Sequence, residues 1–239
     1  MPHYALGNHV FVCLQGEHVV FLDVRKDRYF ALEAAHTLEL AALVRGWPIS
    51  GTQADGAAPE NPEPSTVLGL LLEKGLVTAD GSSGKDATFA SITPLNGELT
   101  AEASVDLPKM RAMELYRFIS AALTASFILR FRSLDRVVER VRRRNLHRSA
   151  HAPPFHAERA LQLVAQFASL RPFFFTAKDA CLFEALALSE FLSAYGLFPN
   201  WVFGVQARPF AAHCWLQQHG FVFNDTVDHV GRFMPIMSV

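Results

Sequence analysis

The sequence has few charged residues and few cysteines. Of its 239 residues only 19% are charged, the formal net charge is −1 and the pI is near 6.8. The chain as a whole therefore gives no reason to expect nucleic acid or an anionic membrane as its partner. The three cysteines, Cys13, Cys181 and Cys214, are too few and too scattered for a disulfide framework, and their odd number favours reduced thiols. We expect a cytoplasmic protein.

Several motifs are also missing from the sequence. The first ten residues lack the basic and apolar regions of a secretory signal. There is no internal repeat, no phosphate-binding glycine loop and no metal-type pair of cysteines. The most apolar stretch, Phe118 to Leu129, is shorter than the about 20 residues that a membrane span needs. We expect this stretch to be a buried helix, with no membrane insertion and no cofactor or metal.

One part of the chain is strongly basic. Residues 130–148 contain eight arginines against Asp135 and Glu139, which gives this stretch a charge of +6 and leaves −7 for the rest. Arginine stems cover apolar surface while their guanidinium groups stay in water, so a solvated helix face is the first interpretation. The alternative is a docking patch for an acidic partner.

The first eighty residues predict a small domain of three strands followed by two helices. Turn-like residues separate the β-prone segments, a loop rich in Pro, Gly and Ala separates the helical stretches, and Gly75 is placed to end the second helix. The predicted strands are 10–14, 18–24 and 29–32, and the predicted helices are about 34–44 and 65–74.

Residues 81–107 are polar and rich in turn residues, without a regular period, which indicates a linker between domains at 1–80 and 108–239. In the second domain helices come first and strands follow, an order typical of the α+β class. The predicted helices are about 108–146, 157–170 and 179–195, and the predicted strands are about 201–205, 212–217 and 221–225.

Cys181 lies at the predicted start of the helix 179–195, with Thr176 or Asp179 available as its cap. Unpaired backbone N–H groups and the positive end of the helix dipole then lie near the sulfur, which favours the thiolate. A cysteine on an apolar helix is by itself most often a small core residue. The interpretation of Cys181 as a nucleophile therefore depends on its partners.

His213 and Asp225 are the candidate partners. In the strand around His213, alternation turns Cys214 to the opposite face, where we expect it to pack in the core without affecting chemistry. A three-residue loop at 218–220 would pair His213 with Asp225 and set the carboxylate opposite the imidazole. Nucleophile, base and orienting residue are then Cys181, His213 and Asp225.

The segments around these three residues form a specific pattern, with 32 positions from the cysteine to the histidine and 12 from the histidine to the aspartate. The segments are Cys181-Leu182, Gly204-Val205, Pro209 to Trp215, and Asn224-Asp225. In this pattern the chain resembles the lasso-peptide biosynthesis B proteins, which cleave the leader from a ribosomally made precursor before the core peptide is closed. One departure is Cys214, where the family more often has a small residue such as Ala.

The resemblance implies the fold and the roles. It implies a papain-like or transglutaminase-like cysteine peptidase as the second domain, with Cys181 as nucleophile, His213 as general base and Asp225 as the residue that orients it. For the first domain it implies a small winged-helix-like module, which binds the leader as an added strand at its sheet edge, beside the last helix. The implied leader contacts are Tyr29, Phe30, Leu32, Val67, Leu70, Leu71 and Lys74.

The resemblance also implies two partners, the leader region of a lasso precursor peptide and the ATP-dependent, asparagine-synthetase-like cyclase that closes the ring. The residues alone leave other interpretations open. The same triad order serves acyl transfer to an amine in transglutaminases and arylamine acetyltransferases, and a non-catalytic peptide adaptor would use Cys181 as a core residue. A zinc site could combine Cys181 and His213 with His219 or His229, although the spacing is poor. The Cys181 backbone N–H is the one oxyanion donor that the sequence identifies.

Overall fold

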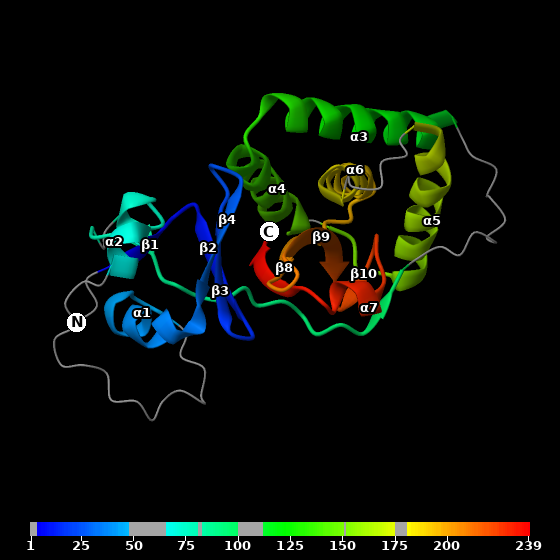
Figure 1. Ribbon diagram of the computed structural model, residues 1–239. Coiled ribbons are helices and arrows are strands. Elements are labelled where there is room, and N and C mark those ends of the chain that lie inside the picture. The colour runs from blue at the N-terminus through cyan, green and yellow to red at the C-terminus, as the bar shows by residue number, and fades with distance from the viewer. Residues whose placement is uncertain (1–3, 48–65, 81–82, 100–111, 151, 175–180) are drawn as a thin grey trace. The chain divides into compact units, whose positions relative to one another are not determined.

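The structure is a computed structural model that describes residues 4–47, 66–80, 83–99, 112–150, 152–174 and 181–239 (Figure 1). The chain divides into two compact units, and each is described by itself. The first unit contains residues 1–91, 205–211 and 234–237, and the second contains residues 92–204, 212–233 and 238–239.

The first unit combines two small sheets with two helices. One sheet is an antiparallel meander of order β2-β3-β4, and the other has the order β5-β1-β6. Side chains from the strands and both helices, among them Phe21, Leu40 and Leu71, share one apolar core. The three strands and two helices predicted for this region are all present. The elements are β1 (Ala5–Gly7), β2 (Val10–Gln15), β3 (His18–Asp23), β4 (Arg28–Glu33), η1 (Ala34–His36), α1 (Thr37–Leu43), α2 (Thr66–Glu73), β5 (Val77–Thr78) and β6 (Gly84–Lys85).

Strand β4 is the outer strand of its sheet. It pairs with β3 along its whole length, and within the described parts of the chain no strand pairs with its other edge. An edge of this kind presents backbone N–H and C=O groups to which a further strand can be added. Helix α2 ends before Gly75, whose φ of +71° closes the helix as predicted.

The segment predicted to be a linker contains short strands. Strand β6 (Gly84–Lys85) pairs with β1 in the first unit, and β7 (Gly97–Glu98) pairs in parallel with a strand of the second unit. Strands of two residues leave no period in the sequence, so a pattern search finds none. Residues 100–107 of the predicted linker lie outside the described residues.

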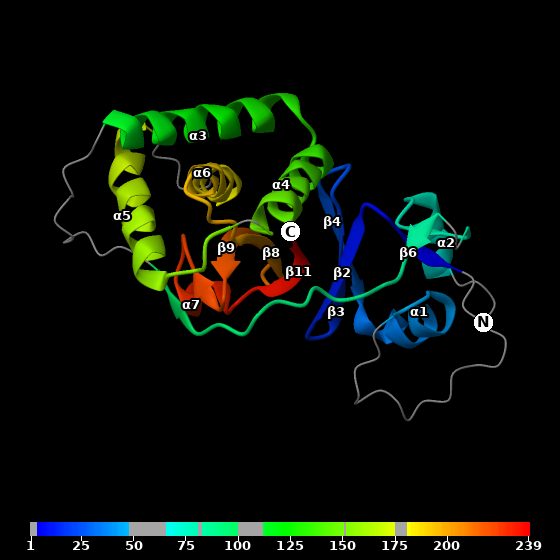
Figure 2. The same ribbon diagram turned by 180° about the vertical axis from the view of Figure 1, so that it is seen from behind.

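The second unit is built around one central helix, α6 (Figure 1, and Figure 2 from behind). It packs against α3 and α5, and between Ala185 and Leu192 every residue except Glu190 is buried, as expected of a core helix. The five-stranded sheet has the order β11-β8-β9-β10-β7. The elements from β7 onward are β7, α3 (Ala112–Phe131), α4 (Leu134–Ser149), α5 (Ala157–Phe174), α6 (Cys181–Ser193), β8 (Asn200–Gln206), β9 (Ala211–Gln218), β10 (Phe221–Val222), α7 (Val227–Val230) and β11 (Met234–Ser238). Residues 205–206 of β8, residue 211 of β9 and residues 234–237 of β11 are grouped with the first unit.

The helix predicted from about 108 to 146 is in fact two helices. Helix α3 ends at Phe131, and Ser133 takes an extended backbone with φ −69° and ψ 153° before α4 begins. Serine favours this non-helical conformation at the start of a helix. The residues before Ala112 lie outside the described part of the chain.

Helix α3 is buried on one face only. Phe118, Ala121, Ala125 and Ile128, spaced by three or four residues, point inward, whereas most residues between them are at least partly exposed. Length and composition alone would allow α3 to cross a membrane, but its inner face packs against α6. The expectation of a buried helix at 118–129 is therefore wrong for the outer face.

The basic helix α4 is not simply a solvated face. Arg144 is buried, its Nη1 lies 2.9 Å from Glu190 Oε1, and its Nη2 donates a hydrogen bond of 2.5 Å to Ser189 Oγ. Burial lowers the pKa of Arg144, and the negative charge of Glu190 opposes this shift. This arginine therefore attaches α4 to α6, while Arg142 and Arg143 are exposed.

The hairpin between β9 and β10 corrects the predicted register. The strand pairing leaves only His219 and Gly220 in the loop, both with positive φ, at 50° and 83°. A two-residue turn of type I′ requires these values, but histidine is not a usual signal for its first position. Strand β10 also ends at Val222, so the predicted strand pairing of position 213 with position 225 does not occur.

Gly204 in β8 provides a test of the packing beside β9. A Cβ atom at this position would lie 2.8 Å from the Trp215 ring and 2.9 Å from Phe233 Cβ. We expect Gly204→Ala to lower the free energy of unfolding in urea by about 1–3 kcal/mol, because the core cannot accept the added methyl group without shifting. The control is Gly69→Ala on α2, where a Cβ would meet nothing within 4 Å. An equal loss in both variants would contradict this packing.

Candidate active site

Cys181 is the first residue of α6, and its side chain is partly exposed with a free thiol. At the start of a helix the backbone N–H groups lack helical acceptors, and the positive end of the helix dipole lies close by. The sulfur therefore lies at the kind of helix terminus that the sequence predicted. The predicted caps Thr176 and Asp179 lie outside the described residues.

The surroundings of Cys181 favour the thiolate strongly and lower the pKa of its thiol to about 4. The largest contribution is a hydrogen bond from the Cys214 thiol, and the His213 imidazole and the Cys214 backbone N–H also donate to the sulfur. Burial acts in the opposite direction but is outweighed. The Cys181 thiol is thus ionised well below neutral pH.

Cys214 plays a different part from the one expected. It is buried, as predicted, but its thiol and its backbone N–H both contact the Cys181 sulfur. The hydrogen bond to Cys181, together with burial, raises the pKa of Cys214 well above its ordinary value. Cys214 is therefore a neutral donor to the nucleophile, and the expectation that it would not affect the chemistry is corrected.

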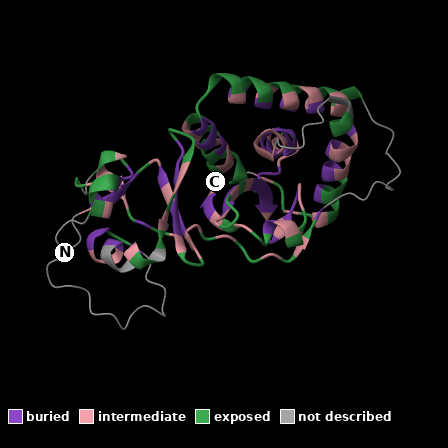
Figure 3. Ribbon diagram, in the orientation of Figure 1, coloured by how far each residue is buried: buried purple, intermediate pink, exposed green. Residues whose placement is uncertain are grey.

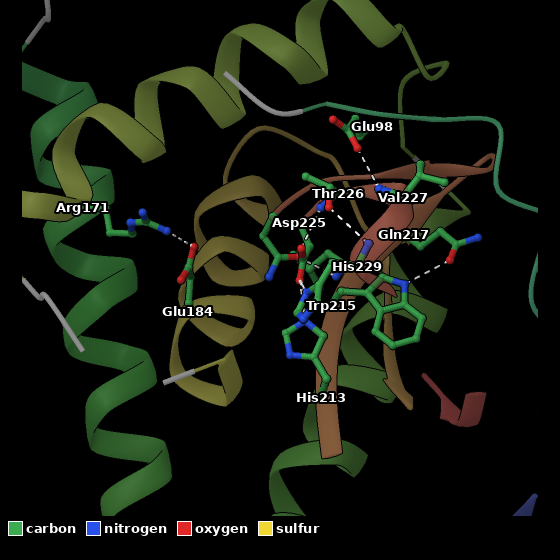
Figure 4. A network of polar contacts seen from close by, with 12 residues as sticks. Glu98, Arg171, Glu184, His213, Trp215, Gln217, Asp225, Thr226, Val227 and His229 are labelled. Carbon is green, nitrogen blue, oxygen red and sulfur yellow. Dashed lines mark hydrogen bonds and ion pairs between the residues drawn. The ribbon is translucent and has the colours of Figure 1, made fainter. Parts of the chain in front are cut away.

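His213 lies on β9 and is paired with Asp225, with His213 Nε2 lying 2.5 Å from Asp225 Oδ2 (Figure 4). Burial lowers the pKa of His213, but hydrogen bonds with Asp225 and Cys181 more than offset it and raise the pKa to about 9. Between the two pKa values Cys181 is a thiolate and His213 is an imidazolium. The three residues selected from the sequence therefore meet.

Asp225 reaches His213 because the backbone leaves the sheet after β10. The Phe223 N–H still donates to the Leu216 carbonyl at 3.0 Å, but the Leu216 N–H donates to the Asn224 side chain at 2.8 Å. A side-chain amide thus takes the place of the next backbone acceptor, and the chain can turn. The contact predicted by strand pairing is made by a bend instead.

Helix α7 adds a residue that the sequence analysis did not assign to the triad. His229 Nδ1 lies 2.8 Å from Asp225 Oδ2, and the Thr226 N–H donates to Asp225 Oδ1 at 2.7 Å. Together with His213 these donors lower the pKa of Asp225, although burial would raise it. The spacing of four residues between Asp225 and His229 is the signal that could have indicated this contact.

The same three side chains offer donor atoms for a cation, since one atom each from His213, Asp225 and His229 lies within 4.8 Å of the others. Asp225 Oδ2, however, is 2.5 and 2.8 Å from the two histidine nitrogens. Donors around one zinc ion, with bonds of about 2.0–2.1 Å, would lie roughly 3.3 Å apart. These separations are those of hydrogen bonds. His219 packs against Phe155, with ring centroids 4.9 Å apart, and is not part of this cluster.

Comparison with protein families places this site in a known class of domain. Residues 121–238 match the family described as the Transglutaminase-like superfamily, and the match includes Cys181, His213 and Asp225. This part of the chain is a transglutaminase-like domain. The superfamily includes cysteine peptidases and acyltransferases. Comparisons with curated proteins and with solved structures found no match.

The transglutaminase-like domain has a small cavity whose lining includes residues close in sequence to Cys181 and Asp225. Its volume is about 180 Å³, its walls are largely apolar, and it includes Asn224, the residue before Asp225. Glu184, one helical turn after Cys181, lies at this cavity and is ion-paired with Arg171 at 2.5 Å (Figure 4).

The residues predicted to bind a leader all lie in the first unit, and all but Leu71 are at least partly exposed. The Lys74 ammonium lies 5.3 Å from the centre of the Phe30 ring, so α2 and β4 are neighbours. Leu71 is fully buried in the core and cannot contact a bound peptide, which corrects its assignment. The other positions are at least partly exposed: Tyr29, Phe30 and Leu32 on β4, Val67 and Leu70 on α2, and Lys74 just after it.

The pKa values of Cys181 and His213 predict that reactivity rises at acidic pH and that catalysis falls at alkaline pH. Alkylation of Cys181 by iodoacetamide should rise as the pH passes about 4, and not near the ordinary cysteine value of about 8.5. Catalysis should fall as the pH passes about 9, because His213 then loses the proton that it donates. Cys214→Ala removes the strongest thiol donor, so the acid limb should move to higher pH. An unchanged limb in that variant would contradict the role of Cys214.

His229 is expected to position Asp225. We expect His229→Ala to lower kcat about ten- to a hundredfold with little change in KM, because a misplaced triad loses reactive geometry. His229→Asn should recover part of the loss, since its amide N–H can donate from nearly the same place as Nδ1. The measurements are steady-state kinetics and the pH profile of each variant. Equal activity of the Ala and Asn variants would refute the hydrogen-bonding role.

Proposed function

We propose that the protein is a cysteine peptidase that binds the leader of a ribosomally made lasso-peptide precursor and hydrolyses the bond between leader and core. The observation that carries the proposal is the ion pair of the Cys181 thiolate with His213, which Asp225 holds in place. A transglutaminase-like domain is consistent with this chemistry. The choice of substrate is supported by the sequence resemblance and by the open edge of β4.

The reaction follows from the protonation states. The Cys181 thiolate attacks the carbonyl carbon at the junction and forms a C–S bond. The His213 imidazolium gives its proton to the leaving nitrogen, and the C–N bond breaks. The leader is then held as a thioester. Neutral His213 removes a proton from water, which attacks the thioester and releases the leader acid and the thiolate.

The structure also suggests how the site binds the reacting groups. The backbone N–H of Cys181, at the start of α6, can donate to the oxyanion of each tetrahedral intermediate. The cavity of about 180 Å³ beside Glu184 and Asn224 would take one side chain of the substrate. Its apolar walls favour an uncharged side chain.

The leader would bind to the first unit. An extended peptide can add to the free edge of β4, where main-chain hydrogen bonds supply affinity, while Phe30, Leu70 and Lys74 contact its side chains. Tethering of the leader raises the effective concentration of the scissile bond at the second unit. The catalytic site itself then needs only a weak affinity for the core.

The product fits a sequence of reactions. Hydrolysis frees the amino group of the core peptide, which an ATP-dependent, asparagine-synthetase-like cyclase would join to a side-chain carboxylate to close the ring. The proposal therefore includes this cyclase as a partner and the cytoplasm, where thiols stay reduced, as the location. The hydrolytic steps themselves use no cofactor.

The test is mass spectrometry of a cognate precursor incubated with the protein. The wild type should give one leader acid and one core peptide, whose masses together exceed the precursor by one water. Cys181→Ala should give neither product. Cys13→Ala, which alters a buried thiol of the first unit, should cleave normally. An amine adduct on the leader would show acyl transfer, and an intact precursor with every variant, in the presence of the cyclase, would refute the proposal.

A second variant separates docking from chemistry. Leu70→Glu places a charge on the exposed face of α2 and should raise KM for the whole precursor. It should leave cleavage of a short peptide without the leader unchanged. A variant that lost both activities equally would exclude the proposed leader site.

A further inference from the structure

The outer face of α3 carries large apolar side chains along its length, with Ser120 exposed between Tyr116 and Leu123, and Figure 3 shows this side of the helix as largely exposed. Spacings of three, four and seven residues place five large side chains on one side of the helix, opposite the face that packs inward. Their exposed fractions range from 58% to 67%. The residues are Met113, Tyr116, Leu123, Phe127 and Phe131.

A face of this kind is unusual for a protein surface. Contiguous apolar patches on soluble domains commonly mark sites of interaction. The rings of Phe127 and Phe131 lie 4.8 Å apart and form an exposed aromatic pair at the end of α3. A helix of this length extends for roughly 30 Å, so the patch is long and narrow.

A basic cavity adjoins the end of this apolar face. It has a volume of about 630 Å³, and α3 contributes Leu123, Thr124, Phe127 and Ile128 to its wall. Arg132, Arg136 and Arg140 complete it from the α4 side.

The charges in this cavity are only partly balanced. Arg140 has a partner, with its Nη2 3.5 Å from Glu190 Oε2. For Arg132 and Arg136, no carboxylate of the described residues lies within ion-pair distance of the guanidinium groups. Two unpaired cations beside an apolar wall fit a ligand that is both anionic and apolar.

We propose that α3 and α4 dock on an anionic phospholipid membrane, with α3 lying in the plane of the surface. Phe, Leu, Met and Tyr side chains of α3 would enter the interface between headgroups and acyl chains, as in other interfacial helices. Arg132 and Arg136 would bind lipid phosphates, and the rest of the basic stretch would add attraction to the surface. The protein stays on one side of the membrane, because the inner face of α3 packs against α6.

Two other occupants fit the surface less well. A second copy docked with its α3 parallel would bring Arg132, Arg136 and Arg140 of both copies together, and like charges would repel, whereas an antiparallel copy would leave both basic cavities without an anionic partner. A partner protein would need a matching groove along the whole convex face of α3. A fluid lipid surface covers a long, convex apolar face without such a groove.

The test is flotation of the whole protein with lipid vesicles. Wild type should float with vesicles of phosphatidylglycerol and phosphatidylcholine in equal parts, bind weakly to phosphatidylcholine alone, and lose binding as salt rises. Phe127→Ser/Phe131→Ser and Arg132→Glu/Arg136→Glu should each reduce the bound fraction about tenfold. Circular dichroism checks that both variants are folded.

The matched control is Arg142→Glu/Arg148→Glu, which changes the net charge equally but alters two exposed arginines outside the cavity. This variant should keep most of its binding. If both charge variants lost binding equally, net charge alone would explain the loss, and the proposed site would be overturned. Wild-type protein that stays at the bottom of the gradient with anionic vesicles would overturn membrane docking, and leader cleavage would be unaffected by that result.

Discussion

The negative charge on Cys181 is the constraint around which the transglutaminase-like domain is built. A partly buried thiolate is costly unless donors and a positive charge lie beside it. The start of α6, the thiol and backbone N–H of Cys214, and the His213 imidazolium meet this requirement together. His213 in turn keeps its proton because Asp225 accepts from it, and Asp225 stays ionised because His229 and Thr226 donate to it. Each member of this chain of contacts therefore supports the charge of the one before it.

Residue type and spacing in the sequence were enough to predict Cys181, His213 and Asp225. The contacts that depend on the local backbone conformation were missed. Cys181 could be placed because an apolar helix began there, and β9 because its residues alternate. The predicted pairing of β9 with the next strand was wrong for two reasons. A histidine occupies the first position of the two-residue turn, and the Asn224 side chain replaces a backbone acceptor. The contact of Asp225 with His213 is nevertheless formed. Such a substitution of side chain for backbone leaves no periodic signal in the sequence.

For the helices, too, the sequence predicted that a segment is helical but not which of its side chains are buried. Composition predicted that 118–129 would be helical, but average hydropathy does not show on which sides a helix is covered. Likewise, eight arginines between 130 and 148 predicted a basic helix, but not that Arg144 would be buried against Glu190. The burial of one arginine among many depends on which turn of α4 meets α6. That is a property of packing, which residue type alone does not determine.

The inner faces of α3 and α4 therefore pack against α6, whereas their outer faces remain exposed. Inward, Phe118 and Ala125 of α3 and Arg144 of α4 hold α6, and α6 carries Cys181 at its first residue. Outward, the apolar side chains of α3 make no contribution to that packing. The same is true of Arg132 and Arg136, which have no ion-pair partner among the described residues. Because burial on α6 already fixes the inner faces, selection on folding alone does not explain aromatic residues on the outer face of α3. A surface that is exposed, apolar and flanked by unpaired cations is better explained by a binding partner than by stability.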